Sequence, residues 1–414
     1  MKINKEKFHS ALVWSAIGLL LFIVYGSAVL KMIDVPIDYP SHIRRAYGIT
    51  WEALCHPLEF LKVNCYPVWH ILTWLTMQIF ECKGRSAAGV VTGGCIVIVW
   101  ACAAIYLSKK YPNKKDVVRA ASIALLLASP IWLPFFNPKL VLGQCSPNLL
   151  HNPTNIIART IAFPCFIWYA AIMDGIGKKS GTGHGAWRII FLSLLLLLSA
   201  LAKPSFVQMF LPAIFILAVC KIVQYKMAAI KPVALVAVSL IPVVVLIAWQ
   251  TWLALYSYGA GAGVGAGVGA VDSGIGISFL TVWSAGSPNV LVSIFLANLF
   301  PLTVLLWSMA ARKITTADVL SWIMYGVAVA EAAFLIEKGC RMWHANFFWA
   351  HNLALFFIWF TAIDKFILLT SEDTEETVGL KHKVWFYIAA TAMSLHLVSG
   401  LCYLWRVMVH GVWW

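Results

Sequence analysis

A series of long apolar segments constrains this chain more than any other feature. A helix needs about 20 apolar residues to cross the hydrocarbon layer of a membrane. Roughly eleven segments meet or approach that length, at 11–31, 88–107, 118–136, 155–174, 188–203, 205–221, 232–252, 287–309, 317–336, 346–364 and 384–407. Because 61% of the 414 residues are hydrophobic and 12% are charged, too little polar surface exists to cover a soluble protein of this size. We therefore predict an all-α polytopic transmembrane helical bundle, with residues 1–414 in a single transmembrane domain.

Basic residues gather in alternate connections between these segments, at 2–7, 109–119, 178–188, 221–231 and 312–313. Short cytoplasmic loops carry an excess of lysine and arginine, so we predict that these clusters are cytoplasmic. The outward connections are then 32–87, 137–154, 253–286 and 337–345. This topology requires residues 67–82 to form an amphipathic helix that lies in the membrane interface. The formal net charge of +14 is explained by the cytoplasmic lysines and favours anionic lipid headgroups as partners, not nucleic acid.

Glycine alternates with alanine and valine between residues 259 and 276, inside the 253–286 connection. The segment has no lysine and no following Ser or Thr that opens a helix, so it is not a phosphate-binding loop of the Walker type. We predict a flexible outward loop. A lid that orders over a bound substrate is the functional alternative.

The first outward connection, 32–87, holds the strongest candidate reaction centre. It carries the carboxylate of Asp38, the imidazoles of His42 and His70, and the guanidinium groups of Arg44 and Arg45. A carboxylate can take the proton of an attacking hydroxyl, and nearby cations can offset charge on a phosphate leaving group. Helix capping by Asp38 and contact of the arginines with lipid headgroups are the simpler alternatives.

The other outward connections contribute further candidates for substrate binding. Lys203 interrupts an apolar run, where an ammonium is costly without a partner, and it suits a phosphate. His151 and Asn152 suit sugar hydroxyls, although Asn152 is equally suited to begin a helix. The remaining candidates are Arg159, Lys338, Arg341 and His344.

Metal and cofactor signatures are weak in this sequence. The ten cysteines form no Cys-x-x-Cys pair and no cluster with histidine at ligand spacing. The predicted chemistry requires no cofactor, although Asp34, Asp38 and His42 together could hold a divalent ion. No Gly-x-Gly-x-x-Gly motif follows a strand, which favours a lipid-linked sugar donor over a nucleotide sugar.

Several of these residues resemble the integral-membrane glycosyltransferases of the GT-C class, over residues 11 to 215. The similarity is to enzymes that use polyprenyl-phosphate sugars, such as the lipid A aminoarabinose transferases and the protein mannosyltransferases. Tyr66-Pro67-Val68-Trp69-His70 is similar to their Pro-Pro-Leu-Tyr-Tyr stretch, and Ala202-Lys203-Pro204 to their Thr-Lys-Gly stretch. The resemblance implies that Asp38 is the catalytic base and that Lys203 lies near the donor phosphate. The chain departs from the family in having a lone Asp38, Val68 in place of a proline, and Pro204 in place of a glycine.

We therefore expect a glycosyltransferase of a bacterial cytoplasmic membrane, with its active site on the outward face. It would move a sugar from a polyprenyl-phosphate donor to a hydroxyl of a glycan or lipid acceptor. A polysaccharide polymerase or ligase is the first alternative, but would be expected to carry large arginine-rich outward loops later in the chain. A flippase or transporter is the second, and would be expected to show internal repeats with matching broken helices.

Overall fold

The computed structural model describes residues 5–35, 38–178, 186–253, 274–371 and 380–411, without the side chains of 5–7, 186 and 340–341. Within these residues, nine helices are long and apolar enough to cross a membrane. They are α1 (Lys5–Ile33), α6 (Gly84–Lys110), α8 (Pro153–Gly175), α10 (Ser205–Tyr225), α11 (Met227–Trp252), α13 (Val290–Ala310), α14 (Thr316–Phe334), α15 (Phe348–Leu369) and α16 (Leu380–His410). The chain is thus an all-α, multi-pass membrane protein.

Shorter elements connect these helices. They are α2 (Asp38–Tyr47), α3 (Trp51–Cys55), α4 (Pro57–Val63), α5 (Val68–Phe80), α7 (Lys115–Leu127), α9 (Ala186–Ala202), α12 (Thr281–Gly286) and the 3-10 helix η3 (Gly339–His344). Two short strands, β1 (Ile275–Ile277) and β2 (Leu335–Glu337), pair antiparallel with Ile275 opposite Glu337. Residues 254–273, which hold most of the predicted flexible Gly-rich loop, lie outside the described residues.

Helix α15 forms the centre of the bundle, since 89% of its membrane-length window is buried. It packs against α14 and α13, and its aromatic residues contact those of α8 and α10, as in the pairs Phe163–Phe360 and Phe206–Phe357. The outer helices α1, α11 and α16 bury only 22%, 17% and 28% of their windows. Apolar side chains on these outer helices face outward, which is the arrangement expected in lipid.

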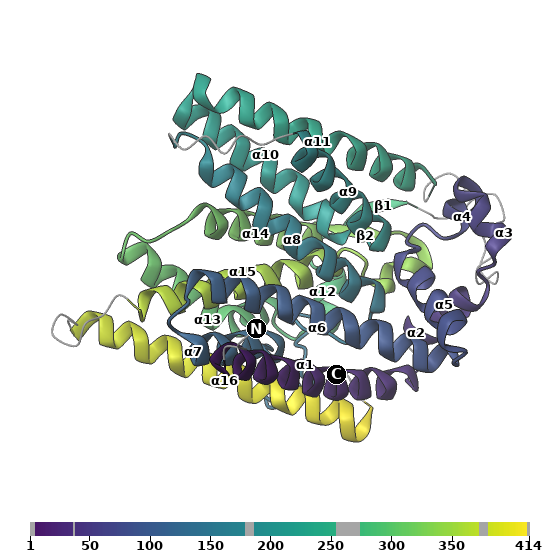
Figure 1. Ribbon diagram of the computed structural model, residues 1–414, viewed down its shortest axis with the longest axis horizontal. Helices are drawn as coiled ribbons and strands as arrows, with labels where there is room; N and C mark the ends of the chain where they lie inside the picture. Colours follow the sequence, from purple (N-terminus) through teal and green to yellow (C-terminus); the bar gives the residue numbers. More distant parts are fainter. Residues whose placement is uncertain (1–4, 36–37, 179–185, 254–273, 372–379, 412–414) are drawn as a thin grey trace.

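The two ends of the bundle differ in chemistry. In Figure 1, α2, α3, α4, α5 and the β1–β2 pair gather at one end of the long axis. The opposite end carries the basic turns, where Lys110 pairs with Asp364 at 2.6 Å and Lys365 with Asp318 at 3.2 Å. The cytoplasmic assignment of the basic turns and the outward assignment of the 32–87 connection stay predictions.

The expected span at 118–136 is wrong as a continuous helix, because α7 ends at Leu127. A proline disfavours helical backbone in the residue before it, and Pro130 follows soon after this point. The chain then runs through 128–152 without regular helix, yet most of it is buried. Asn148 Nδ2 donates to the carbonyl oxygens of Leu125 and Ala128 at 2.7 and 2.9 Å, which satisfies the open end of α7. The expected span at 188–203 is the shorter helix α9, so nine of the eleven expected segments are helices of membrane-spanning length within the described residues.

The predicted helix at 67–82 is present as α5, which spans Val68–Phe80. One face buries Trp69, His70 and Trp74, whereas Phe80 is 70% exposed on the other. Trp69 Nε1 donates to Thr92 Oγ1 of α6 at 3.0 Å, which fixes α5 on the bundle. This anchoring places His70 beside α2.

Candidate functional site

Helix α2 presents Asp38 at its first turn and is fixed by its neighbour Tyr39. The Tyr39 side chain is fully buried, and its hydroxyl donates to the carbonyl oxygen of Leu150 at 2.9 Å. This contact ties α2 to the buried 128–152 segment. Asp38 Oδ2 in turn accepts a hydrogen bond of 2.5 Å from Asn152 Nδ2. The carboxylate is therefore held by a residue 114 positions away in the sequence.

Asn152 joins the carboxylate to a buried ammonium. It begins α8 as the N-cap residue, because its Oδ1 accepts from the backbone N–H of Asn155 at 2.8 Å. The same oxygen accepts from Lys203 Nζ at 3.2 Å. Asn152 thus caps α8, as one of the two alternatives predicted, and its expected contact with sugar hydroxyls stays a prediction. The Asn152 side chain thus donates a hydrogen bond to Asp38 through Nδ2 and accepts one from Lys203 through Oδ1.

Lys203 lies between α9 and α10 and is only 6% exposed. Its Nζ lies 4.4 Å from the ring centroid of Trp349 in α15, a cation–π contact. Burial lowers the pKa of Lys203 to about 7, against the opposing charges of Asp38 and Glu337. The buried ammonium therefore favours the arrival of an anion, which would restore its charged form.

A cavity of about 140 Å³ opens beside Lys203 and is lined by polar groups from four parts of the chain. Asn346 Nδ2 donates to Glu337 Oε2 at 2.5 Å, which fixes the carboxylate on this wall. The polar lining residues are Tyr66, Lys203, Ser205, Gln208, Gln250, Thr251, Glu337, Lys338 and Asn346. The cavity thus combines two lysines with hydrogen-bonding groups, a lining that suits a phosphate with an attached sugar.

Two histidines, the buried His70 and the half-buried His42, stand next to this site. His70 Nδ1 lies 2.9 Å from the carbonyl oxygen of Tyr66, and His70 Nε2 lies 2.8 Å from His42 Nδ1. Burial lowers the pKa of His70 to about 4 and that of His42 well below its usual value, so both rings are neutral at pH 7. Because the Tyr66 carbonyl only accepts, the proton of His70 is on Nδ1, and His42 donates through its own Nδ1. This pairing leaves Nε2 of His42 as a hydrogen-bond acceptor.

The remaining predicted residues divide into groups near the site and groups away from it. Arg45 is half-buried, and its charge contributes to the lowered pKa of His42 and His70, whereas Arg44 is exposed. His151 is buried, with its ring 5.0 Å from that of Trp349.

Arg159 supports a buried segment, and its expected contact with substrate stays a prediction. It is 4% exposed, and its Nη1 donates to Pro147 O at 2.9 Å and to Asn148 Oδ1 at 2.8 Å. It therefore holds the segment that carries Asn152. His344 is exposed in η3, and the side chain of Arg341 lies outside the described residues.

Sequence reasoning did not identify Trp349, Gln208 or Gln250 as site residues. Gln250 had a usable signal, since a buried amide within an apolar span is expensive without a role. Its Nε2 donates to the carbonyl oxygen of Cys65 at 2.8 Å, which joins α11 to the 32–87 connection. Trp349 had no such signal, because one aromatic residue among many apolar neighbours is typical of a core.

No cluster of three or more His, Cys, Asp or Glu side chains suited to a metal ion occurs in the part of the chain that the structure describes. Asp34, which could have joined Asp38 and His42 around an ion, instead pairs with Arg85 at 2.8 Å. Comparison with protein-family models, with curated proteins and with solved structures gives no match for this chain.

Proposed function

We propose that the protein is a membrane glycosyltransferase that moves a sugar from a polyprenyl-phosphate donor to a hydroxyl of a glycan or lipid acceptor. The proposal places the reaction on the outward face of a bacterial cytoplasmic membrane. The observation that carries it is the chain of contacts from Asp38 through Asn152 to Lys203, beside a polar cavity. A base and a buried cation held at fixed separation are what this transfer requires.

Asp38 is assigned the role of general base. Its Oδ2 is held by Asn152, and the carboxylate is half-buried, so its other oxygen can accept the acceptor proton. As the acceptor oxygen forms a bond to the anomeric carbon, the bond from that carbon to the phosphate oxygen breaks. The electron pair leaves with the polyprenyl phosphate, and the configuration at the anomeric carbon inverts.

Lys203 and Lys338 are assigned to the phosphate. Both line the cavity, and Lys203 is buried where electrostatic attraction to an anion is strong. The cation–π contact with Trp349 keeps the ammonium in place without neutralising it. His42, with a free acceptor nitrogen, is assigned to a hydroxyl of the donor sugar.

The test is transfer of a radiolabelled sugar from a panel of polyprenyl-phosphate donors by purified protein and by Asp38→Asn. This variant keeps the shape of the side chain and removes the base. We expect transfer to fall by about 10²–10⁴-fold while donor binding is retained. Full activity of Asp38→Asn would remove Asp38 from the mechanism. Movement or lengthening of a lipid-linked glycan without sugar transfer would favour the flippase or polymerase alternative.

A further inference from the structure

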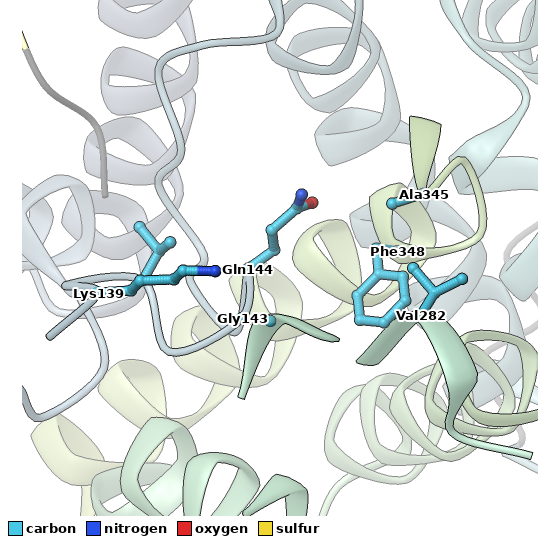
Figure 2. A pocket seen from close by; sticks show the side chains of 8 residues that line it. Lys139, Gly143, Gln144, Val282, Ala345 and Phe348 are labelled. Atoms are coloured by element: carbon cyan, nitrogen blue, oxygen red, sulfur yellow. The ribbon is translucent and has the colours of Figure 1, made fainter. Parts of the chain in front are cut away.

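A second cavity lies on the other side of the turn that precedes α15. Asn346 and Phe347 line the cavity beside Lys203, whereas Ala345 and Phe348 line this one, which has a volume of about 210 Å³. Figure 2 shows Lys139 and Gln144 on one side of it and Phe348 with Val282 on the other. One wall is therefore polar and the opposite wall apolar.

The polar wall is held in a strained and fixed conformation. Leu142, Gly143 and Gln144 have φ angles of +46°, +77° and +70°, a run that L-residues rarely adopt. A Cβ on Gly143 would lie 3.2 Å from the backbone of Gly286, so only glycine allows this close approach. Strain of this kind costs about 1–3 kcal/mol per residue and clusters at binding sites.

Asn137 fixes the same wall from its other end. Its Oδ1 accepts from the backbone N–H of Lys139 at 2.9 Å, and its Nδ2 donates to the carbonyl oxygen of Gly286 at 3.4 Å. The 137–144 segment is thus held against Gly286 of α12 by one hydrogen bond and by the close approach of Gly143. Lys139 and Gln144 are presented by a wall that is already formed in the free protein.

The chemistry of the two walls restricts the ligand. Gln144 Oε1 is buried and accepts no hydrogen bond from the described residues, so it needs a donor that an ionised phosphate or carboxylate does not supply. The half-buried Lys139 can donate to an acceptor, and the ring of Phe348 offers an apolar face. A sugar ring supplies all three features, because its hydroxyls both donate and accept and its C–H face packs on an aromatic ring.

We propose that this cavity between Lys139, Gln144, Phe348 and Val282 binds one sugar residue. Binding of a sugar here does not depend on the proposed glycosyl transfer. The backbone of 345–348 separates the two cavities, so the sugar bound here occupies a site distinct from that of the sugar that is transferred.

Saturation-transfer NMR with water-soluble methyl glycosides tests the proposal without any need for activity. The probes are methyl β-D-glucoside, methyl α-D-mannoside and methyl β-D-glucuronide, with butyl phosphate as the anionic comparison, on purified protein in nanodiscs. The variants are Val282→Trp, which fills the cavity, and Gln144→Leu, which removes the amide. Val245→Trp, on the exposed surface of α11, is the matched control.

We expect at least one glycoside to bind, and its affinity to fall about tenfold in Gln144→Leu, the loss of about one hydrogen bond. Val282→Trp should abolish the signal and Val245→Trp should leave it unchanged. Glycoside binding that survives both cavity variants, or butyl phosphate binding here in place of every glycoside, overturns the proposal. If Val282→Trp fails to fold, Gln144→Leu and Lys139→Gln decide the question alone. Sugar binding in a protein that transfers no sugar would refute the proposed function and leave this site in place.

Discussion

The charge of Lys203 should control donor binding as a function of pH. Its pKa is lowered to about 7 by burial, so the ligand-free side chain loses its proton within the neutral range. A bound prenyl phosphodiester carries one negative charge at every pH above about 2, and this charge raises the pKa of Lys203 again. Binding should therefore take up a proton above pH 7 and become weaker as the pH rises.

The size of the effect follows from the fraction of Lys203 that is charged. With a pKa of about 7, nearly all of the side chain is charged at pH 6. At pH 9 about 1% is charged, because each pH unit above the pKa lowers that fraction tenfold. If the bound phosphate restores an ordinary lysine pKa, affinity should fall about 100-fold between pH 6 and pH 9, or about 2.7 kcal/mol.

Isothermal titration calorimetry with a short prenyl methyl phosphodiester measures both the affinity and the proton uptake, in buffers of different ionisation enthalpy. Lys203→Met removes the ammonium from a side chain of similar length, so its binding should be weak and independent of pH. Lys221→Met, at the basic end of the bundle, is the matched control and should bind like the parent. The reasoning is refuted if Lys203→Met keeps the pH dependence or if the parent shows none.

Three further predictions concern stability, each measured by thermal unfolding in detergent. Gly400→Ala should destabilise the protein by about 3 kcal/mol or more, because its Cβ would lie 1.6 Å from the carbonyl oxygen of Leu127. The control Gly326→Ala, with open space around the new Cβ, should stabilise the protein slightly. Equal effects of the two substitutions would contradict the packing of α16 on α7. Arg159→Met should cost about 2 kcal/mol or more by leaving two buried oxygens without a donor, and an unchanged transition would show that these hydrogen bonds contribute nothing. Burial lowers the pKa of His151 to about 3, so the unfolded chain binds the extra proton and stability should fall as the pH drops from 6.5 towards 3. His151 contributes about 1.4 kcal/mol per pH unit to this slope, and the slope should decrease by that amount in His151→Asn. An equal slope would show that other groups cause the acid sensitivity.

Local sequence patterns predicted the helical elements well where apolar runs were uninterrupted. The long helices and the amphipathic α5 follow from the spacing of apolar residues, since each helix satisfies its own backbone hydrogen bonds. The prediction of a continuous helix at 118–136 was wrong because hydropathy does not show where a helix ends. There Pro130 disfavours the helix, and Asn148 supplies hydrogen bonds that let the irregular backbone remain buried.

The sequence alone determined the class of the protein, and it singled out Asp38, Asn152 and Lys203 as candidate site residues. Only the tertiary structure joined these three, through contacts that span 114 and 51 positions along the chain. It also placed Trp349 beside Lys203 and assigned Arg159 to the support of a buried loop. The physical reason is that a polar side chain near the membrane can find its partner on any helix that packs beside it. Hydropathy reports the length of each helix, and the choice of neighbours depends on the packing of the whole bundle.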